Sequence, residues 1–222
     1  HFENESLTLS KISKLAKNYK TNILIGSLQT KILNNKNHLI VNRSFLINTH
    51  GKIIQRYDKI HMFDVKLPNG KEFKESKTYS AGNKAVISKL SIRNNKYKLG
   101  LTICYDLRFP CLFQDLAKAG AQMIFVPSAF TKMTGSCHWH TLLKARAIET
   151  GCFVIAPAQI GKHFSNRESY GHSLIISPWG KILADGKTKE GLVSAKIDID
   201  EVKKTRKMIP NLSNHKNYSV EF

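Results

Sequence analysis

The sequence lacks long apolar runs, paired cysteine motifs and low-complexity linkers. No uninterrupted apolar stretch approaches the roughly 18 residues needed to cross a bilayer, and no charged-then-apolar leader stands at the start. The four cysteines show no C-x-x-C spacing, and a chain of 222 residues, 41% of them hydrophobic, is large enough to form a core without disulfides. No internal repeat or Pro-rich boundary divides the chain. We therefore expect one soluble, cytoplasmic domain over residues 1–222, with free thiols and no membrane contact.

Acidic residues are also scarce, with 16 Asp and Glu against 35 Lys and Arg and a formal net charge of +19. Such a charge can steer anionic ligands or hold nucleic acid. The basic residues are mostly Lys, scattered among Asn and Ile, without a long block or an aromatic-interleaved stripe. We expect a solvated basic surface and no nucleic-acid partner. A basic nucleic-acid-binding protein is the alternative, which the absence of a salt-dependent shift of DNA or RNA would eliminate.

Hydrophobic periodicity alternates between helices and strands along the chain. Helices are predicted over residues 7–19, 110–119 and 139–150. Strands are predicted over residues 22–26, 38–48, 52–57, 99–104, 123–127, 153–158, 173–177, 181–184 and 193–197. Alternating strands and helices with added hairpins favour an α/β layered sandwich, with helices packed outside mixed sheets.

One corner of this predicted fold carries a candidate nucleophile. Cys104 ends an apolar strand, is followed by Tyr105-Asp-Leu-Arg108, and precedes the helix that Pro110 opens. Such strand-to-turn-to-helix corners lift a side chain out of the sheet edge and leave backbone N–H groups free nearby. A thiol there can attack a carbonyl carbon. The alternative for Cys104 is a small buried hydrophobic residue, which is what most free cysteines are.

A cysteine nucleophile needs a base that makes the thiolate and donors that hold the oxyanion. Several histidines are available, but none lies in a segment typical of a Cys-His-Asn protease. Lys59 lies just past a strand end, and Glu75 lies shortly before the strand run that leads to Cys104. Taken without further context, Lys59 would be one of many surface lysines and Glu75 a solvated acid in a Lys-rich loop.

Motifs in a fixed order resemble one known family. The order found in the nitrilase, or carbon–nitrogen hydrolase, superfamily is matched by Tyr57-Asp-Lys-Ile-His-Met-Phe-Asp64, Glu75-Ser76, Cys104-Tyr-Asp-Leu-Arg-Phe-Pro110, residues 139–149, Tyr170-Gly-His-Ser173 and Pro178-Trp-Gly180. The chain most resembles bacterial members of the deaminated-glutathione amidase and omega-amidase branch, through Arg146-Ala-Ile-Glu-Thr150, Ala158-Gln159 and Glu168-Ser-Tyr-Gly-His172. The resemblance implies a four-layer α-β-β-α sandwich of the nitrilase type, a homodimer, and no metal or cofactor.

The resemblance also implies roles for particular residues. The family's nucleophile falls on Cys104 and its catalytic lysine on Lys59, whose ammonium would stabilise the oxyanion together with the N–H of Tyr105. Glu75 matches a second glutamate that supports this lysine, which completes a Glu-Lys-Cys triad. The implied reaction is acyl transfer, in which the thiolate attacks an amide, ammonia leaves, and water releases the acid from a thioester.

The family's principal base, a glutamate in a Pro-Glu motif, has no match in the chain. In the family it lies upstream of the helix predicted over residues 7–19, and Glu3 and Glu5 lack the Pro-Glu context. The resemblance therefore implies a single carbon–nitrogen hydrolase domain that lacks its N-terminal strand-helix-strand. An initial His in place of Met agrees with a trimmed chain.

The implied substrate is a small molecule that carries a carboxylate. Arg108 and Thr134 resemble carboxylate-binding positions of the omega-amidase branch, and Tyr105 is expected to line the same pocket. A guanidinium near the thiol would hold a carboxylate through paired hydrogen bonds. The alternatives are a structural salt bridge of Arg108 to Asp106 or Asp64, and a loop or helix-cap position for Thr134.

Two functional hypotheses follow from the resemblance. The first is an amidase that acts on a small carboxylated amide such as deaminated glutathione or an alpha-keto acid omega-amide. The second is a catalytically inactive remnant that keeps the fold and binds the acid product or a partner. The presence of a Pro-Glu segment upstream in the parent gene would separate them.

Overall fold

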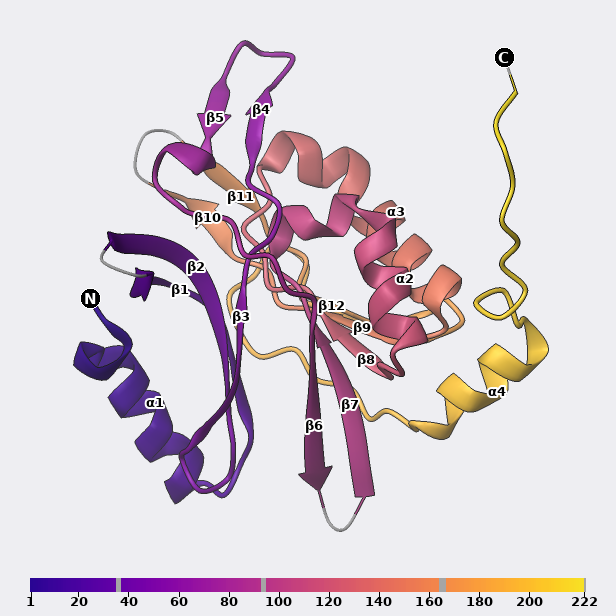
Figure 1. Ribbon diagram of the computed structural model, residues 1–222, viewed down its shortest axis with the longest axis horizontal. Helices are drawn as coiled ribbons and strands as arrows, with labels where there is room; N and C mark the ends of the chain where they lie inside the picture. Colours follow the sequence, from indigo (N-terminus) through magenta and orange to yellow (C-terminus); the bar gives the residue numbers. More distant parts are fainter. Residues whose placement is uncertain (35–36, 93–94, 164–166, 222) are drawn as a thin grey trace.

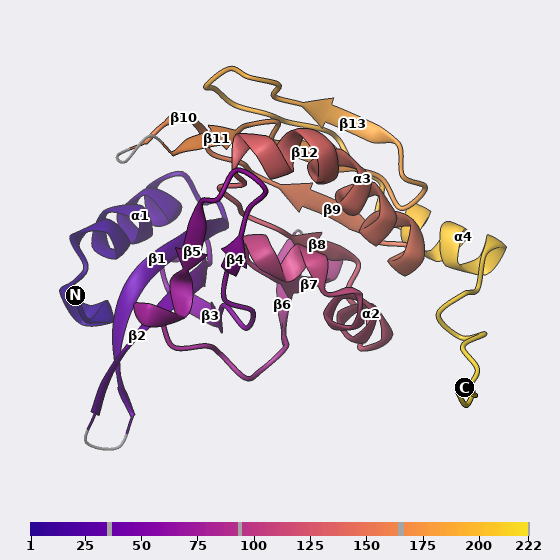
Figure 2. The same cartoon turned by 90° about the horizontal axis from the view of Figure 1, so that it is seen from above.

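The computed structural model describes residues 1–34, 37–92, 95–163 and 167–221. Two β-sheets pack face to face with helices on both outer sides, which gives four layers (Figure 1). Helix α1 (Leu7–Asn18) lies outside the first sheet, and α2 (Pro110–Lys118) and α3 (Lys132–Thr150) lie outside the second. Figure 2 shows the same order from above. The α/β sandwich predicted from the sequence is therefore confirmed.

The first sheet has the order β1-β2-β3, with antiparallel neighbours. Its strands are β1 (Ile23–Asn34), β2 (Asn37–Ile47) and β3 (Ile53–Asp58). The sequence predicted that the first strand ends at residue 26. Strand β1 instead continues to Asn34, because the irregularity between Ile25 and Leu28 shifts its register against β2 without ending the pairing. The strand passes Gly26 and Ser27 and then resumes pairing.

The second sheet has the order β13-β12-β9-β8-β7-β6, with parallel pairing only among β7, β8 and β9. Its strands are β6 (Val86–Ile92), β7 (Asn95–Leu101), β8 (Met123–Phe125), β9 (Phe153–Ala156), β12 (Leu174–Ile176) and β13 (Ile182–Asp185). The strand predicted over residues 193–197 was wrong, since that segment pairs with no described strand. Val193, Ala195 and Ile197 are half-buried and the residues between them are exposed. The alternation of apolar and polar residues therefore reflects alternate burial of side chains and not strand pairing.

Three apolar layers hold the four structural layers together. Between α1 and the first sheet lie Leu9, Ala16, Ile25, Phe45 and Ile47. Between the two sheets lie Leu46, Leu90, Leu99, Met123 and Phe153. The helices α2 and α3 cover the opposite face of the second sheet, which includes Ile124 and Val154. Successive residues of β8 and β9 therefore enter opposite layers, as expected for parallel strands that are buried on both faces.

Helix α3 begins at Lys132, seven positions before the predicted start at residue 139. Thr131 is its N-cap, and the Thr131 Oγ1 accepts a hydrogen bond from the Thr134 N–H at 3.3 Å. The first turns bury small residues such as Gly135 rather than a stripe of large apolar ones, so hydrophobic periodicity could not mark them. The helix ends at Gly151, which has a φ of 57°.

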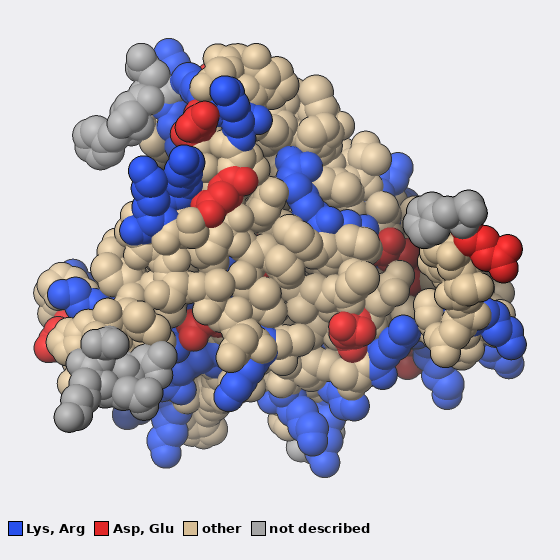
Figure 3. Space-filling model, turned by 45° about the horizontal axis from the view of Figure 1, so that its top comes forward, with Lys and Arg blue, Asp and Glu red and all other residues tan. Residues whose placement is uncertain are grey.

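Shorter elements border the layers. Two hairpins, β4 (Asp64–Lys66) with β5 (Glu72–Lys74) and β10 (Ile160–Lys162) with β11 (Glu168–Tyr170), project beyond one end of the sheets (Figure 1). Helix α4 (Asp200–Met208) lies near the C-terminus. Within the described part of the chain, no helix is both long enough and apolar enough to cross a membrane. On the face in Figure 3, Lys and Arg side chains stand in several groups separated by uncharged surface.

Candidate active site

Cys104 lies in a cavity of about 690 Å³ between the ends of the strands. It begins the short 3-10 helix Cys104–Arg108, which follows the end of β7 at Leu101 after two residues. Its φ is +51°, a left-handed conformation that is rare for a side chain other than glycine. The Cys104 N–H donates to the Pro127 carbonyl at 2.9 Å, which fixes the corner to the end of β8. The sharp corner expected from the sequence is present, and its thiol lies at the cavity.

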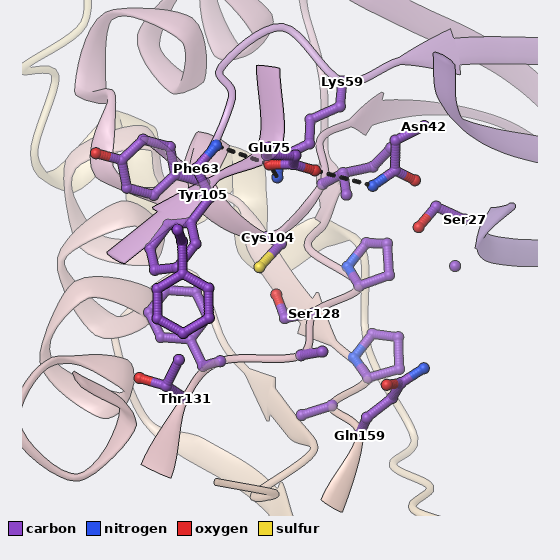
Figure 4. Close-up of a pocket in the computed structure, with 18 of the residues that line it drawn as sticks. Ser27, Asn42, Lys59, Phe63, Glu75, Cys104, Tyr105, Ser128, Thr131 and Gln159 are labelled. Carbon is purple, nitrogen blue, oxygen red and sulfur yellow. Dashed lines mark hydrogen bonds and ion pairs between the residues drawn. The ribbon is translucent and has the colours of Figure 1, made fainter. Parts of the chain in front are cut away.

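Lys59 and Glu75 form an ion pair on the same cavity, although they come from different segments. The Lys59 side chain is only 3% exposed, so it is not one of the surface lysines. One Glu75 oxygen also accepts the Phe63 N–H at 2.7 Å, and the other accepts the Asn42 amide at 3.4 Å. Figure 4 shows Cys104 between this pair and Ser128. The predicted Glu-Lys-Cys set is therefore brought together at one cavity.

A buried carboxylate, Asp106, connects the Lys59 segment to the Cys104 corner. Asp106 is fully buried and accepts the Tyr57 hydroxyl at 2.6 Å and the Ile103 N–H at 2.8 Å. Its other oxygen accepts the His61 N–H at 3.0 Å and contacts His61 Nδ1 at 2.8 Å. Burial, and then the charge of Asp106, raise the pKa of Tyr57 far above its ordinary value, so the phenol stays a donor. Lys59 is thereby held between two anchored neighbours.

The predicted substrate-binding residues divide into two groups. Tyr105 and Thr134 line the cavity, where Thr134 Oγ1 lies 2.9 Å from Thr131 Oγ1. Arg108 is not among the residues that line the cavity. Its guanidinium lies 5.9 Å from the Tyr105 ring centroid and 5.4 Å from that of Phe130. Phe130 also lines the cavity, so Arg108 lies against two aromatic residues of the cavity wall, Tyr105 and Phe130, without lining the cavity itself.

Arg108 forms neither of the salt bridges considered from the sequence. Its guanidinium nitrogens lie 3.3 Å from His138 Nδ1 on α3. Asp106 is occupied by the donors described above, and Asp64 accepts the Ser76 N–H at 3.0 Å. The contact of Arg108 is therefore with a histidine and with aromatic rings rather than with a carboxylate.

Sequence reasoning missed several polar groups at or beside the cavity. Asn42 and Arg167 line it, and the Arg167 guanidinium donates to the Ala129 carbonyl at 2.8 Å. Asp106 was considered only as a partner for Arg108. A usable signal was its place two residues after Cys104, inside a short helix where a carboxylate can reach back to the preceding N–H. Asn42 and Arg167 carried no local signal, because each is isolated in its own segment.

The other cysteines lie outside the cavity. Cys111 and Cys137 are exposed, and Cys152 is buried. Burial raises the pKa of the Cys152 thiol, which makes it a poor nucleophile. Of the four thiols, Cys104 is therefore the one placed for chemistry.

Comparison with known proteins agrees with this geometry. The carbon-nitrogen hydrolase family model matches residues 3–207. The chain belongs to the carbon–nitrogen hydrolase family. The match spans nearly all described elements, so the fold and the cavity both lie within the hydrolase region.

Relatives and solved structures of this hydrolase family are similar over most of the chain. The deaminated glutathione amidase of Synechocystis is 43% identical over 203 residues, which cover 90% of this chain and 73% of that protein. That of Dictyostelium discoideum is 43% identical, over 96% of this chain and 73% of its own length. The C. elegans NitFhit structure has a TM-score of 0.85 and 36% identity over 96% of this chain, which spans about half (51%) of that protein. Saccharomyces cerevisiae Nit3, a nitrilase superfamily member, has a TM-score of 0.79 and 31% identity over 95% of this chain and 72% of its own.

Proposed function

We propose that the chain is an amidase that cleaves a small carboxylated amide through a cysteine acyl-enzyme and releases ammonia. The observation that carries this proposal is the convergence of Cys104, Lys59 and Glu75 on one cavity. A thiol can attack an amide carbonyl, an ammonium can stabilise the resulting oxyanion, and a carboxylate can orient the ammonium. The names of the Synechocystis and Dictyostelium relatives support amides as the substrate class. Deaminated glutathione or an alpha-keto acid omega-amide is the proposed substrate, and the cytoplasm the proposed location.

The proposed reaction has two halves. In the first, the Cys104 thiol loses its proton, its sulfur forms a bond to the amide carbon, the carbon–nitrogen bond breaks, and the nitrogen takes up one proton and leaves as ammonia. In the second, water adds to the thioester carbon, the carbon–sulfur bond breaks, one water proton passes to the sulfur, and the acid leaves with the thiol restored. Lys59 and the N–H of Tyr105 donate to the oxyanion in both halves, and Glu75 keeps the Lys59 ammonium oriented.

Replacing Cys104 by Ala tests the nucleophile directly. Ammonia release from an omega-amide should fall to the uncatalysed rate, because no carbon–sulfur bond can form. Cys111→Ala, which removes an exposed thiol outside the cavity, is the matched control and should keep full turnover. Unchanged turnover by the Cys104 variant would refute the proposed mechanism. Mass spectrometry of the quenched wild-type protein should show the acyl adduct on the peptide that contains Cys104.

We also propose that a guanidinium binds the substrate carboxylate. Arg108 holds this role by resemblance, whereas Arg167 lines the cavity itself. Lysine keeps the charge but loses the planar fork that pairs with a carboxylate. Arg108→Lys and Arg167→Lys should therefore be compared on a carboxylated and a neutral amide. The binding residue is the one whose loss raises KM for the carboxylated amide alone, and equal losses on both amides would show a structural role. Thr134 is proposed to assist through its hydroxyl.

A second candidate function, binding of the acid product without turnover, is favoured by one observation. Glu75 is the sole carboxylate among the described residues that line the cavity, and Lys59, Phe63 and Asn42 already engage it. A separate proton acceptor for the thiol is therefore not provided by those lining residues. Calorimetric binding of an alpha-keto dicarboxylate without any ammonia release from its omega-amide would favour this alternative over the amidase.

A homodimer is part of the proposal, carried over from the family resemblance. The chain after Ile209 runs away from the body of the molecule in Figure 1. It carries Tyr218, which is 82% exposed, and Val220, which is 67% exposed. Apolar residues on an extended tail are suited to contact a second copy. Light scattering after gel filtration measures the mass, and a monomer at micromolar concentration would contradict the dimer.

A further inference from the structure

Three metal-binding side chains converge outside the catalytic cavity. His140 comes from α3, His172 from the turn between β11 and β12, and Asp185 from the end of β13. Their ligand atoms all lie within 4.8 Å of one another. None of the three lines the cavity that holds Cys104, so the proposed amidase reaction gives this cluster no task.

The Asp185 carboxylate lies between the two imidazoles. Its Oδ2 atom is 3.1 Å from His172 Nδ1 and 3.7 Å from His140 Nε2. In a tetrahedral zinc site with bonds of about 2.0–2.1 Å, neighbouring ligand atoms are roughly 3.3 Å apart. The two measured separations lie on either side of that value. His140 is 31% exposed, so its ring has room to turn toward His172 and bring the third pair to the same spacing.

Surrounding contacts hold two of the ligands in place before any ion binds. The His172 N–H donates to the Lys187 carbonyl at 2.7 Å, and the Lys187 N–H donates to Asp185 Oδ1 at 2.7 Å. The Trp139 indole N–H donates to the His172 carbonyl at 2.8 Å, and the Tyr170 ring stacks on the His172 imidazole at 4.6 Å. Outer contacts of this kind fix ligand orientation and raise metal affinity.

We propose that His140, His172 and Asp185 form a zinc-binding site with water as the fourth ligand. Two imidazole nitrogens and one carboxylate oxygen are a ligand set that zinc favours over magnesium or calcium, which prefer oxygen. The side chains are 18% to 31% exposed, which leaves a path for the ion and its water.

The ion would join α3 to the hairpin of β12 and β13, which lie beside it in Figure 2. Ser173 follows His172 directly, and its hydroxyl accepts the Ala158 N–H at 2.9 Å. Both Ser173 and Ala158 line the catalytic cavity, so the zinc site braces one side of it without entering the chemistry.

His140→Gln is the decisive variant, because it removes one ligand and leaves the hydrogen bond between His172 and Asp185 intact. The untagged protein, stripped with chelator and dialysed, is titrated with Zn²⁺ against a chromophoric competitor. The wild type should bind one equivalent, and His140→Gln should bind at least tenfold more weakly. His50→Ala, which removes an exposed histidine in a distant turn, is the matched control and should bind like the wild type.

Thermal unfolding gives a second readout of the same site. Zinc at about a hundred times its Kd should raise the wild-type Tm by roughly 5–10 °C and leave that of His140→Gln unchanged. Without zinc the wild type and His140→Gln should have the same Tm, which excludes misfolding of the variant. Replacing zinc by Co²⁺ should give the visible absorption of a tetrahedral site without a thiolate charge-transfer band. Equal zinc affinity in the wild type and His140→Gln, or a thiolate band, would overturn the proposal.

Discussion

Replacing Asp106 by Asn perturbs the one buried carboxylate that joins the Lys59 segment to the Cys104 corner. Asp106 accepts hydrogen bonds from the backbone N–H groups of His61 and Ile103, one at each of its carboxylate oxygens. An asparagine has one acceptor oxygen and one NH₂ group. Whichever way the amide turns, its NH₂ group therefore faces one of these backbone donors. The Tyr57 hydroxyl can rotate to accept instead, but a backbone N–H cannot.

The expected cost follows from these contacts. The backbone donor that is left without an acceptor lowers the free energy of unfolding by about 1–3 kcal/mol. The other hydrogen bonds lose their charged acceptor, which lowers it by roughly a further 1.5–3 kcal/mol. Asp106 is fully buried, so water cannot replace the lost partner. The sum, about 2.5–6 kcal/mol, is a large part of the 5–15 kcal/mol or so that stabilises an ordinary domain. For a chain of this size the Tm should fall by roughly 5–24 °C.

Urea unfolding followed by tryptophan fluorescence measures this loss, with the buried Trp139 as the reporter. Asp64→Asn is the matched control, because that carboxylate is exposed on β4, where water can replace the hydrogen bonds that it accepts from Ser76 and from the Glu75 backbone. It should unfold like the wild type. An Asp106 variant within about 1 kcal/mol of the wild type would refute the reasoning. Below its Tm the variant should also lose kcat, because misplaced reactive groups slow acyl transfer.

Three further substitutions test the ion pair of the site and the packing beside it. Lys59→Met and Glu75→Gln each leave one member of a buried ion pair alone, and each should lower the free energy of unfolding by about 3 kcal/mol. The double variant should lose clearly less than the sum of the two single losses. Additive losses in urea unfolding would show that the pair does not interact. Gly135→Ala places a Cβ 2.4 Å from the Tyr170 side chain and should destabilise by about 1–3 kcal/mol, although alanine favours helices. A higher Tm for Gly135→Ala would contradict the close approach of α3 to β11.

Local pattern was sufficient for much of the fold. The helix at Leu7, the hairpin of β2 and β3, and the strands before and after α2 follow from periodicity and from turn residues, because these features depend on near neighbours. The predictions failed where contacts between residues distant in the sequence determine the local structure. The first turns of α3 pack through Gly135 against Tyr170, and the segment at residues 193–197 buries alternate side chains without a strand to pair with.

The same distinction applies to the candidate site. Cys104, Lys59 and Glu75 stand in motifs, so their order along the chain was enough to predict that they meet. The direction of the Arg108 side chain was not predictable, because it depends on Phe130 and His138, which lie more than twenty residues away. The role of Asp106 was hidden for the same reason, since its contacts reach back 45 and 49 residues to His61 and Tyr57.

The backbone of Cys104 explains why those distant contacts matter for the thiol. A non-glycine residue at a φ of +51° is strained by about 1–3 kcal/mol and persists only where its surroundings hold it there. Glycine would adopt this conformation without strain but would carry no thiol. The corner is held on one side by the Cys104 N–H bond to Pro127 and on the other by the Ile103 N–H bond to Asp106. Asp106 therefore both positions Lys59 and stabilises the strained backbone that directs the nucleophile, so its loss should disturb both halves of the site together.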